Sequence, residues 1–170
     1  MRLLRKAMDL VVGGLCCLLL AGMVAVLAWQ VFSRYALNDP STFSEEALRY
    51  GVIWLSLLGA AYSTGQGTHM AIDLLRDMST GRVRLALQIL VPVSLMIFGI
   101  GVLLIGGMRG VQIAGGQTSA VLRLPMAYVY ASLPVSGALI AIYSLLNLID
   151  LLRHRRVVPD AFERAALAGD

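Results

Sequence analysis

The chain has 170 residues, of which 58% are hydrophobic and only 14% charged. Soluble domains carry roughly a quarter charged residues, so this composition predicts an integral membrane protein organised as one helical domain. The formal charge of +4 does not indicate nucleic-acid binding, because the arginines stand at the edges of apolar runs and do not line one face of a helix.

The apolar runs predict four transmembrane helices, since about 20 residues at 1.5 Å each cross a hydrocarbon core of about 30 Å. We expect the spans at about residues 10–33, 50–68, 85–108 and 125–150. The third contains Pro92, which should kink the helix without breaking it. The fold class is therefore all-α, with a four-helix membrane domain over residues 1–152 and a basic tail over residues 153–170.

The first apolar run follows a basic start, as a secretory signal does, but at about 24 residues it exceeds the roughly 7 to 15 of a signal core. A lipoprotein signal is also disfavoured, because the bulky Leu15 precedes Cys16. We expect this segment to stay in the protein as a helix. The adjacent Cys16 and Cys17 have neither redox nor zinc-site spacing and are interpreted as packing residues.

Orientation follows from the positive residues. Of the 14 Lys and Arg residues, an inside N-terminus would leave only Arg34, Arg49, Arg109 and Arg123 outside. Because cytoplasmic flanks are rich in Lys and Arg, we expect both termini in the cytoplasm.

The connections also predict structure. Thr42 and Glu45 have the spacing of a capping box, and Glu45 and Arg49 that of a supporting i, i+4 pair. In a helix over residues 69–80, the apolar side chains would lie on one face and the polar side chains on the other. This pattern predicts a short interfacial helix on the inner membrane surface.

Candidate chemistry is sparse. The middle of each expected span lacks an ionisable residue, and neither H-E-x-x-H nor G-x-S-x-G occurs. We therefore predict no catalytic, substrate-binding or metal-binding residue, no cofactor, and a protein that is not an enzyme. The polar residues Gln30, Gln88 and Asn147 are interpreted as interhelical hydrogen-bonding groups, and Gly106 with Gly110 forms a G-x-x-x-G that permits close helix approach.

The densest charged feature is Arg34, Glu45, Glu46 and Arg49 at the expected outer boundary. One interpretation is a solvated interfacial flank held by internal pairs. The other is a docking surface, because two carboxylates and two guanidiniums at a helix start can bind a partner's complementary charges.

Several motifs occur together, in order, between about residues 30 and 137: W-Q-V-F-S-R-Y (29–35), N-D-P (38–40), S-E-E-A-L-R-Y (44–50), G-A-A-Y (59–62), G-T-H-M-A-I-D (67–73) and L-P-M with L-P-V-S-G (124–137). This combination resembles the small, Q-type membrane subunit of tripartite ATP-independent periplasmic (TRAP) transporters. Departures from that pattern are Phe43 in place of tryptophan, Gln66 in place of arginine and Ala120 in place of proline.

The resemblance implies a multi-pass protein of the bacterial inner membrane, surrounded by lipid and paired with a large multi-helix permease subunit that is fed by a periplasmic binding protein. It implies sodium-driven uptake of an organic anion such as a dicarboxylate, a sugar acid or sialic acid, with this chain as the scaffold. Carried onto this sequence, the family's charged positions are expected to act in assembly: Arg34, Glu45, Glu46, Arg49, His69 and Asp73.

Two other classes compete with this interpretation. A self-sufficient exporter or channel built from four-helix protomers should have a pore-lining carboxylate, and Asp9 and Asp150 lie near helix ends. A membrane redox enzyme should have paired cysteines or axial histidines within its spans, and neither is present in this sequence.

Overall fold

A computed structural model describes residues 2–39, 41–66 and 82–154. These residues form helices joined by short connections, which confirms the all-α class. The elements are α1 (Arg2–Ala36), α2 (Thr42–Gln66), α4 (Arg82–Phe98), the π-helical η1 (Gly99–Gly106), α5 (Gly107–Ala114), α6 (Met126–Tyr130) and α7 (Ser132–His154). Within the described ranges the β-structure amounts to one isolated antiparallel bridge, between Thr118 and Pro125.

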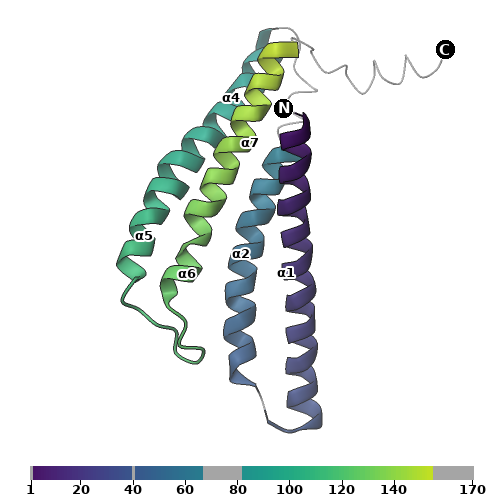
Figure 1. Ribbon diagram of the computed structural model, residues 1–170, viewed down its shortest axis with the longest axis vertical. Coiled ribbons are helices and arrows are strands. Elements are labelled where there is room, and N and C mark those ends of the chain that lie inside the picture. Colours follow the sequence, from purple (N-terminus) through teal and green to yellow (C-terminus); the bar gives the residue numbers. More distant parts are fainter. Residues whose placement is uncertain (1, 40, 67–81, 155–170) are drawn as a thin grey trace, which may run out of the picture.

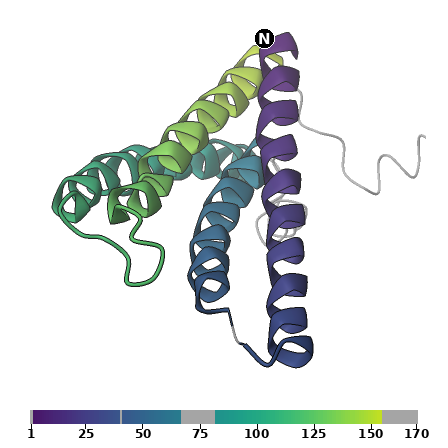
Figure 2. The same ribbon diagram turned by 60° about the horizontal axis from the view of Figure 1, so that its bottom comes forward.

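The helices run back and forth between two ends of a bundle. The start of α1, the start of α4 and the end of α7 lie at one end, while the α1–α2 turn and the α5–α6 loop lie at the other (Figure 1). We call these the first end and the second end. Figure 2 shows that α1 and α2 diverge from α4, α5 and α6 toward the second end.

Among the described residues, three stretches are long and apolar enough to cross a membrane: Arg5–Ala36, Ile89–Ala114 and Met126–Leu152. They correspond to the predicted spans at 10–33, 85–108 and 125–150. The middle stretch extends beyond the predicted end because α5 continues the helix past Arg109 to Ala114. Pro92 lies inside α4 without ending it, as expected.

The predicted second span, at 50–68, is not among these stretches. Helix α2 has 25 residues, enough length to cross a bilayer, but it carries charged residues near its start (Glu45, Glu46 and Arg49) and polar residues further on (Ser56 and the run 62–64). Its apolar content is therefore too low for it to qualify by composition. A fourth transmembrane helix stays a prediction.

The core lies where α2, η1 and α7 meet. The buried residues Ala61, Leu103 and Ile140 form one cluster, against which Leu95, Leu133 and Leu139 pack. Helix α2 packs between α1 and α7, and α7 packs against α4 and η1. Outside this core, α1 exposes large apolar side chains such as Leu10 and Leu18, as expected for a helix surrounded by lipid.

Glycines set the closest helix approach, but not at the predicted G-x-x-x-G. A Cβ added at Gly106 would meet nothing within 4 Å, and one at Gly110 would only touch Tyr130 at 3.4 Å. A Cβ at Gly137 of α7, in contrast, would lie 2.7 Å from the carbonyl oxygen of Gly99 in η1, and one at Gly107 would lie 2.8 Å from Leu133 Cβ. The backbones of η1 and α7 therefore touch because Gly99 and Gly137 lack side chains.

Candidate functional site

The charged residues predicted to act in assembly lie at the second end, where α1 stops and α2 starts. Asn38 adopts a left-handed conformation, with φ of 52°, in the turn between the two helices. Arg34 lies in the last turn of α1 and Glu45 in the first turn of α2. We call Arg34, Glu45, Glu46 and Arg49 the outer cluster. The side chains of Arg34, Glu45 and Arg49 are exposed, whereas Glu46 is partly covered.

The N-terminus of α2 is organised by serines and not by the predicted capping box. The helix begins at Thr42, so Ser41 takes the flanking position. Ser44 is fully buried, its hydroxyl donates to the carbonyl oxygen of Ser41 at 2.6 Å, and the two hydroxyl oxygens are 2.5 Å apart. These bonds hold the start of the helix and leave the Glu45 carboxylate available for other contacts.

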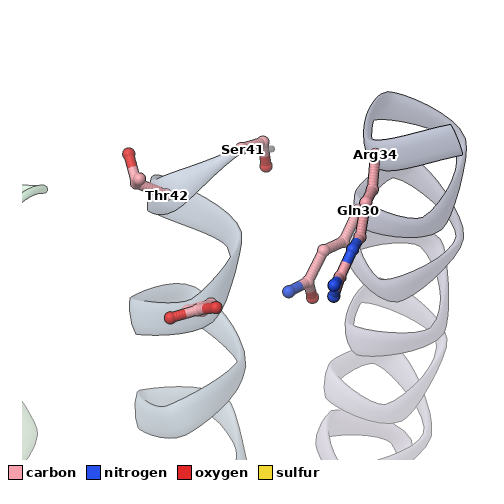
Figure 3. Close-up of a pocket in the computed structure, with 5 residues that line it drawn as sticks. Gln30, Arg34, Ser41 and Thr42 are labelled. Carbon is pink, nitrogen blue, oxygen red and sulfur yellow. The ribbon is translucent and has the colours of Figure 1, made fainter. Parts of the chain in front are cut away.

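A small polar depression lies between the end of α1 and the start of α2. It encloses about 60 Å³ and is lined by Gln30, Arg34, Ser41, Thr42 and Glu45. The side chains of Gln30 and Arg34 extend from α1 toward α2 (Figure 3). Gln30 thus lines this open depression. The predicted ion pair between Glu45 and Arg49 is not formed, because the single ion pair within the described ranges joins Arg5 to Asp150.

Glu46 forms hydrogen bonds to another part of the same chain. Its carboxylate accepts hydrogen bonds from three consecutive backbone N–H groups of the α5–α6 loop: Ala120 at 3.1 Å, Val121 at 3.2 Å and Leu122 at 2.9 Å. The Leu122 N–H has the largest effect on this carboxyl, and together with the Ser119 hydroxyl and the other two amides it lowers the pKa of Glu46, against the opposing effect of partial burial. Of the outer cluster, Glu46 therefore has the clearest internal role.

His69 and Asp73 lie outside the described residues, as do the predicted interfacial helix at 69–80 and the tail from residue 155 onward. Their expected roles stay predictions. In the part of the chain that the structure describes, no three His, Cys, Asp or Glu side chains come together as a metal site would require.

A second polar site, at the first end, was not predicted. Arg5 of α1 forms an ion pair of 3.2 Å with Asp150 of α7 and also donates to the carbonyl oxygen of Gly65 in α2. The hydroxyl of Tyr143 donates to Asp9 at 2.9 Å. We call Arg5, Asp9, Tyr143, Asn147 and Asp150 the inner cluster.

Asn147 completes this cluster by donating to the carbonyl oxygen of Thr64 at 2.8 Å, which confirms its interpretation as an interhelical hydrogen-bonding residue. A sequence signal for the cluster existed. Tyr143, Asn147 and Asp150 are spaced i, i+4 and i+7, and Arg5 and Asp9 are spaced i, i+4, so each set lies on one helical face. The inner cluster ties α1, α2 and α7 together.

The arrangement is that of a polytopic helical membrane protein whose polar groups bind its own helices to one another. Comparison with known families gives the assignment. The model for the DctQ component of tripartite ATP-independent periplasmic transporters matches residues 23–154, and the chain belongs to this family. It is a component of a tripartite transport system in the bacterial inner membrane, and it is not an enzyme.

Two curated relatives agree with this assignment. The chain is 27% identical over 153 residues to the sialic acid TRAP transporter small permease protein SiaQ of Vibrio cholerae, covering 90% of this chain and 88% of that protein. It is 32% identical over 72 residues to a putative TRAP transporter small permease protein of Haemophilus influenzae, covering 42% of each chain. A membrane redox enzyme is thereby excluded.

Proposed function

We propose that this chain is the scaffold subunit of a sodium-coupled, binding-protein-dependent importer of organic anions. Its task would be to hold a large permease subunit in place while that subunit carries the cargo. The supporting observation is the inner cluster: the charged groups Arg5, Asp9 and Asp150 are engaged with other helices near the ends of α1 and α7. Binding an anion at mid-membrane would require a positive group there to offset its desolvation.

The proposed topology has four spans, with both termini in the cytoplasm, a membrane domain over residues 1–152 and a basic cytoplasmic tail over 153–170. Its support is that α1 starts and α7 ends at the same end of the bundle (Figure 1). Helix α2 would be the fourth span, with a length of about 37 Å at 1.5 Å per residue. Its lower apolar content is tolerable because α1 and α7 cover part of its surface.

The proposed partners are a large multi-helix permease subunit and a periplasmic substrate-binding protein. We place the permease contact at the outer cluster, with His69 and Asp73 as further contact residues. Arg34, Glu45 and Arg49 are exposed at the second end, so they are accessible to a partner of complementary charge. Glu46 would support this contact indirectly, because its carboxylate is already bonded to Ala120, Val121 and Leu122.

The proposed cargo class is an organic anion, such as sialic acid, a sugar acid or a dicarboxylate. Its support is the similarity to the Vibrio cholerae protein, whose name includes sialic acid. An identity of 27% supports the class of cargo without distinguishing its members.

The test is reconstitution into liposomes with an inward sodium gradient and a panel of radiolabelled anions. This chain alone should move none of them, whereas adding the large subunit and the matching binding protein should produce saturable, sodium-dependent uptake. Removing sodium from that complete system should abolish uptake. Uptake by this chain on its own would reject the scaffold role in favour of a self-sufficient exporter or channel.

A further inference from the structure

The loop between α5 and α6, residues 115–125, is a closed turn at the second end of the bundle, and we call it the outer loop. The N–H of Ser119 donates to the carbonyl oxygen of Leu124 at 2.9 Å, and the N–H of Met126 donates to that of Gln117 at 2.8 Å. The Leu124 N–H donates to the Ser119 hydroxyl at 3.2 Å. These bonds join the two sides of the loop, and Arg123 turns the chain with a φ of 51°.

The backbone N–H groups at the tip of this loop find their hydrogen-bond acceptor outside the loop. The N–H groups of Ala120, Val121 and Leu122 all donate to the two carboxylate oxygens of Glu46 in α2, more than 70 positions earlier in the chain. Successive backbone N–H groups of this kind form a concave anion-binding site, and here the anion is supplied by the protein itself. Bonds from N–H groups to a charged carboxylate are stronger than those to a neutral acceptor.

From this geometry we propose that Glu46 is a latch that fixes the outer loop to α2 and thereby sets the position of α5 and α6 relative to α1 and α2 at the second end. Glu46 is a positioning residue in this proposal, not a group that touches a partner. The nearest additional polar link on α2 is a weak one, from the Tyr50 hydroxyl to the Met126 sulfur at 3.6 Å. The latch therefore depends mainly on a single side chain.

The neighbouring carboxylate, Glu45, shows that the position of Glu46 on the helix determines which surface its side chain reaches. Glu45 lies one residue earlier in α2, which rotates it by about 100° around the helix, and it lines the polar depression beside Arg34. Two adjacent glutamates thus serve different surfaces: Glu45 faces the turn between α1 and α2, and Glu46 holds the outer loop. The pair supplies a matched control, because each can be changed while the other remains.

The test uses the full-length chain in lipid nanodiscs and measures hydrogen–deuterium exchange at the amides of residues 120–122. Glu46→Ala removes both acceptor oxygens, and exchange there should rise about tenfold or more, as expected for a locally opened loop. Glu46→Gln keeps one neutral acceptor and should give a smaller rise. Glu45→Ala should leave the three amides at the exchange rate of the unaltered protein.

Trypsin gives a second readout. Arg123 is exposed, and cleavage after it requires the loop to leave its closed form. The Arg123–Leu124 bond, followed by mass spectrometry, should be cut faster in Glu46→Ala than in Glu45→Ala.

Equal exchange in Glu46→Ala and the unaltered protein, or equal increases in the two alanine variants, would overturn the latch. Amides of α7 around Tyr143 report whether a variant is still folded. If Glu46→Ala loses protection there as well, Glu46→Gln decides, since an unchanged loop in that folded variant would also reject the proposal. Neither readout uses a partner or transport, so the latch and the scaffold role can fail separately.

Discussion

The hydroxyl of Tyr143 in α7 donates a hydrogen bond of 2.9 Å to the Asp9 carboxylate in α1, joining residues that are 134 positions apart. Tyr143 is fully buried, and Arg5, one turn before Asp9 in α1, pairs with Asp150, two turns after Tyr143 in α7. Helix α1 otherwise packs mainly against α2. These contacts therefore connect α1 directly to α7.

Tyr143→Phe should destabilise the protein by about 1 kcal/mol, because it removes one hydrogen bond to a charged acceptor while keeping the ring. The measurement is SDS-induced unfolding followed by circular dichroism. Tyr128→Phe is the control, since Tyr128 is 68% exposed. A Tyr143→Phe variant as stable as that control would show that the bond to Asp9 contributes nothing.

Gly137→Ala should be destabilising by about 1–3 kcal/mol, because the new methyl group would overlap the Gly99 carbonyl oxygen and force η1 away from α7. Gly22→Ala in α1 is the comparison. A Cβ there meets nothing within 4 Å, so alanine should be neutral or slightly stabilising through its better helix propensity. Thermal unfolding in detergent measures both, and similar shifts for the two variants would contradict the close contact.

The pH dependence of the Glu46 contacts has a defined sign. Because the folded-state pKa of Glu46 is lowered, its contribution to stability is present above the usual glutamate pKa of about 4.3 and is lost as the pH falls through the lowered value. A titration of ¹³C-labelled glutamate side chains by NMR should assign Glu46 a pKa below 4.3. A value at or above that would mean that the amides of residues 120–122 do not stabilise the carboxylate.

The proposed topology predicts opposite labelling of two introduced cysteines, once Cys16 and Cys17 are made serine. Thr118→Cys in the exposed part of the outer loop should react with an impermeant thiol reagent added to the periplasm, and Ser79→Cys should not. Labelling of whole cells against lysed cells measures this. The reverse pattern would place the termini outside.

Arg49→Glu should lower recovery of the complex with the large permease subunit, because like charges facing each other across an interface oppose association. Co-purification on an affinity tag carried by the large subunit measures this, with Arg109→Glu as a control at an exposed arginine outside the outer cluster. Normal recovery combined with altered uptake would argue against an assembly role for Arg49.

The sequence was sufficient to locate the helices with long apolar runs. The predicted spans overlap α1, the stretch from α4 to α5 and the stretch from α6 to α7. It was less informative where side chains meet across the fold. The pairing of Arg5 with Asp150 depends on which helix ends come together, and local spacing does not specify this. Glu46 was assigned to a partner surface because its neighbours in the sequence do not reveal its hydrogen bonds. The amides that it binds belong to a loop more than 70 residues away, so the local sequence would be the same if Glu46 were exposed.

The modest apolar content of α2 has a consequence for biosynthesis. On the proposed topology α2 must enter the membrane with Glu45, Glu46 and Arg49 at its leading edge, and charged residues make insertion of an isolated segment unfavourable. Helix α1 precedes α2 in the chain and packs along it, whereas α7 is synthesised after α2. On this topology we expect α1 and α2 to enter the membrane as a hairpin, and the surface of α2 that packs against α7 to face lipid until α7 is made.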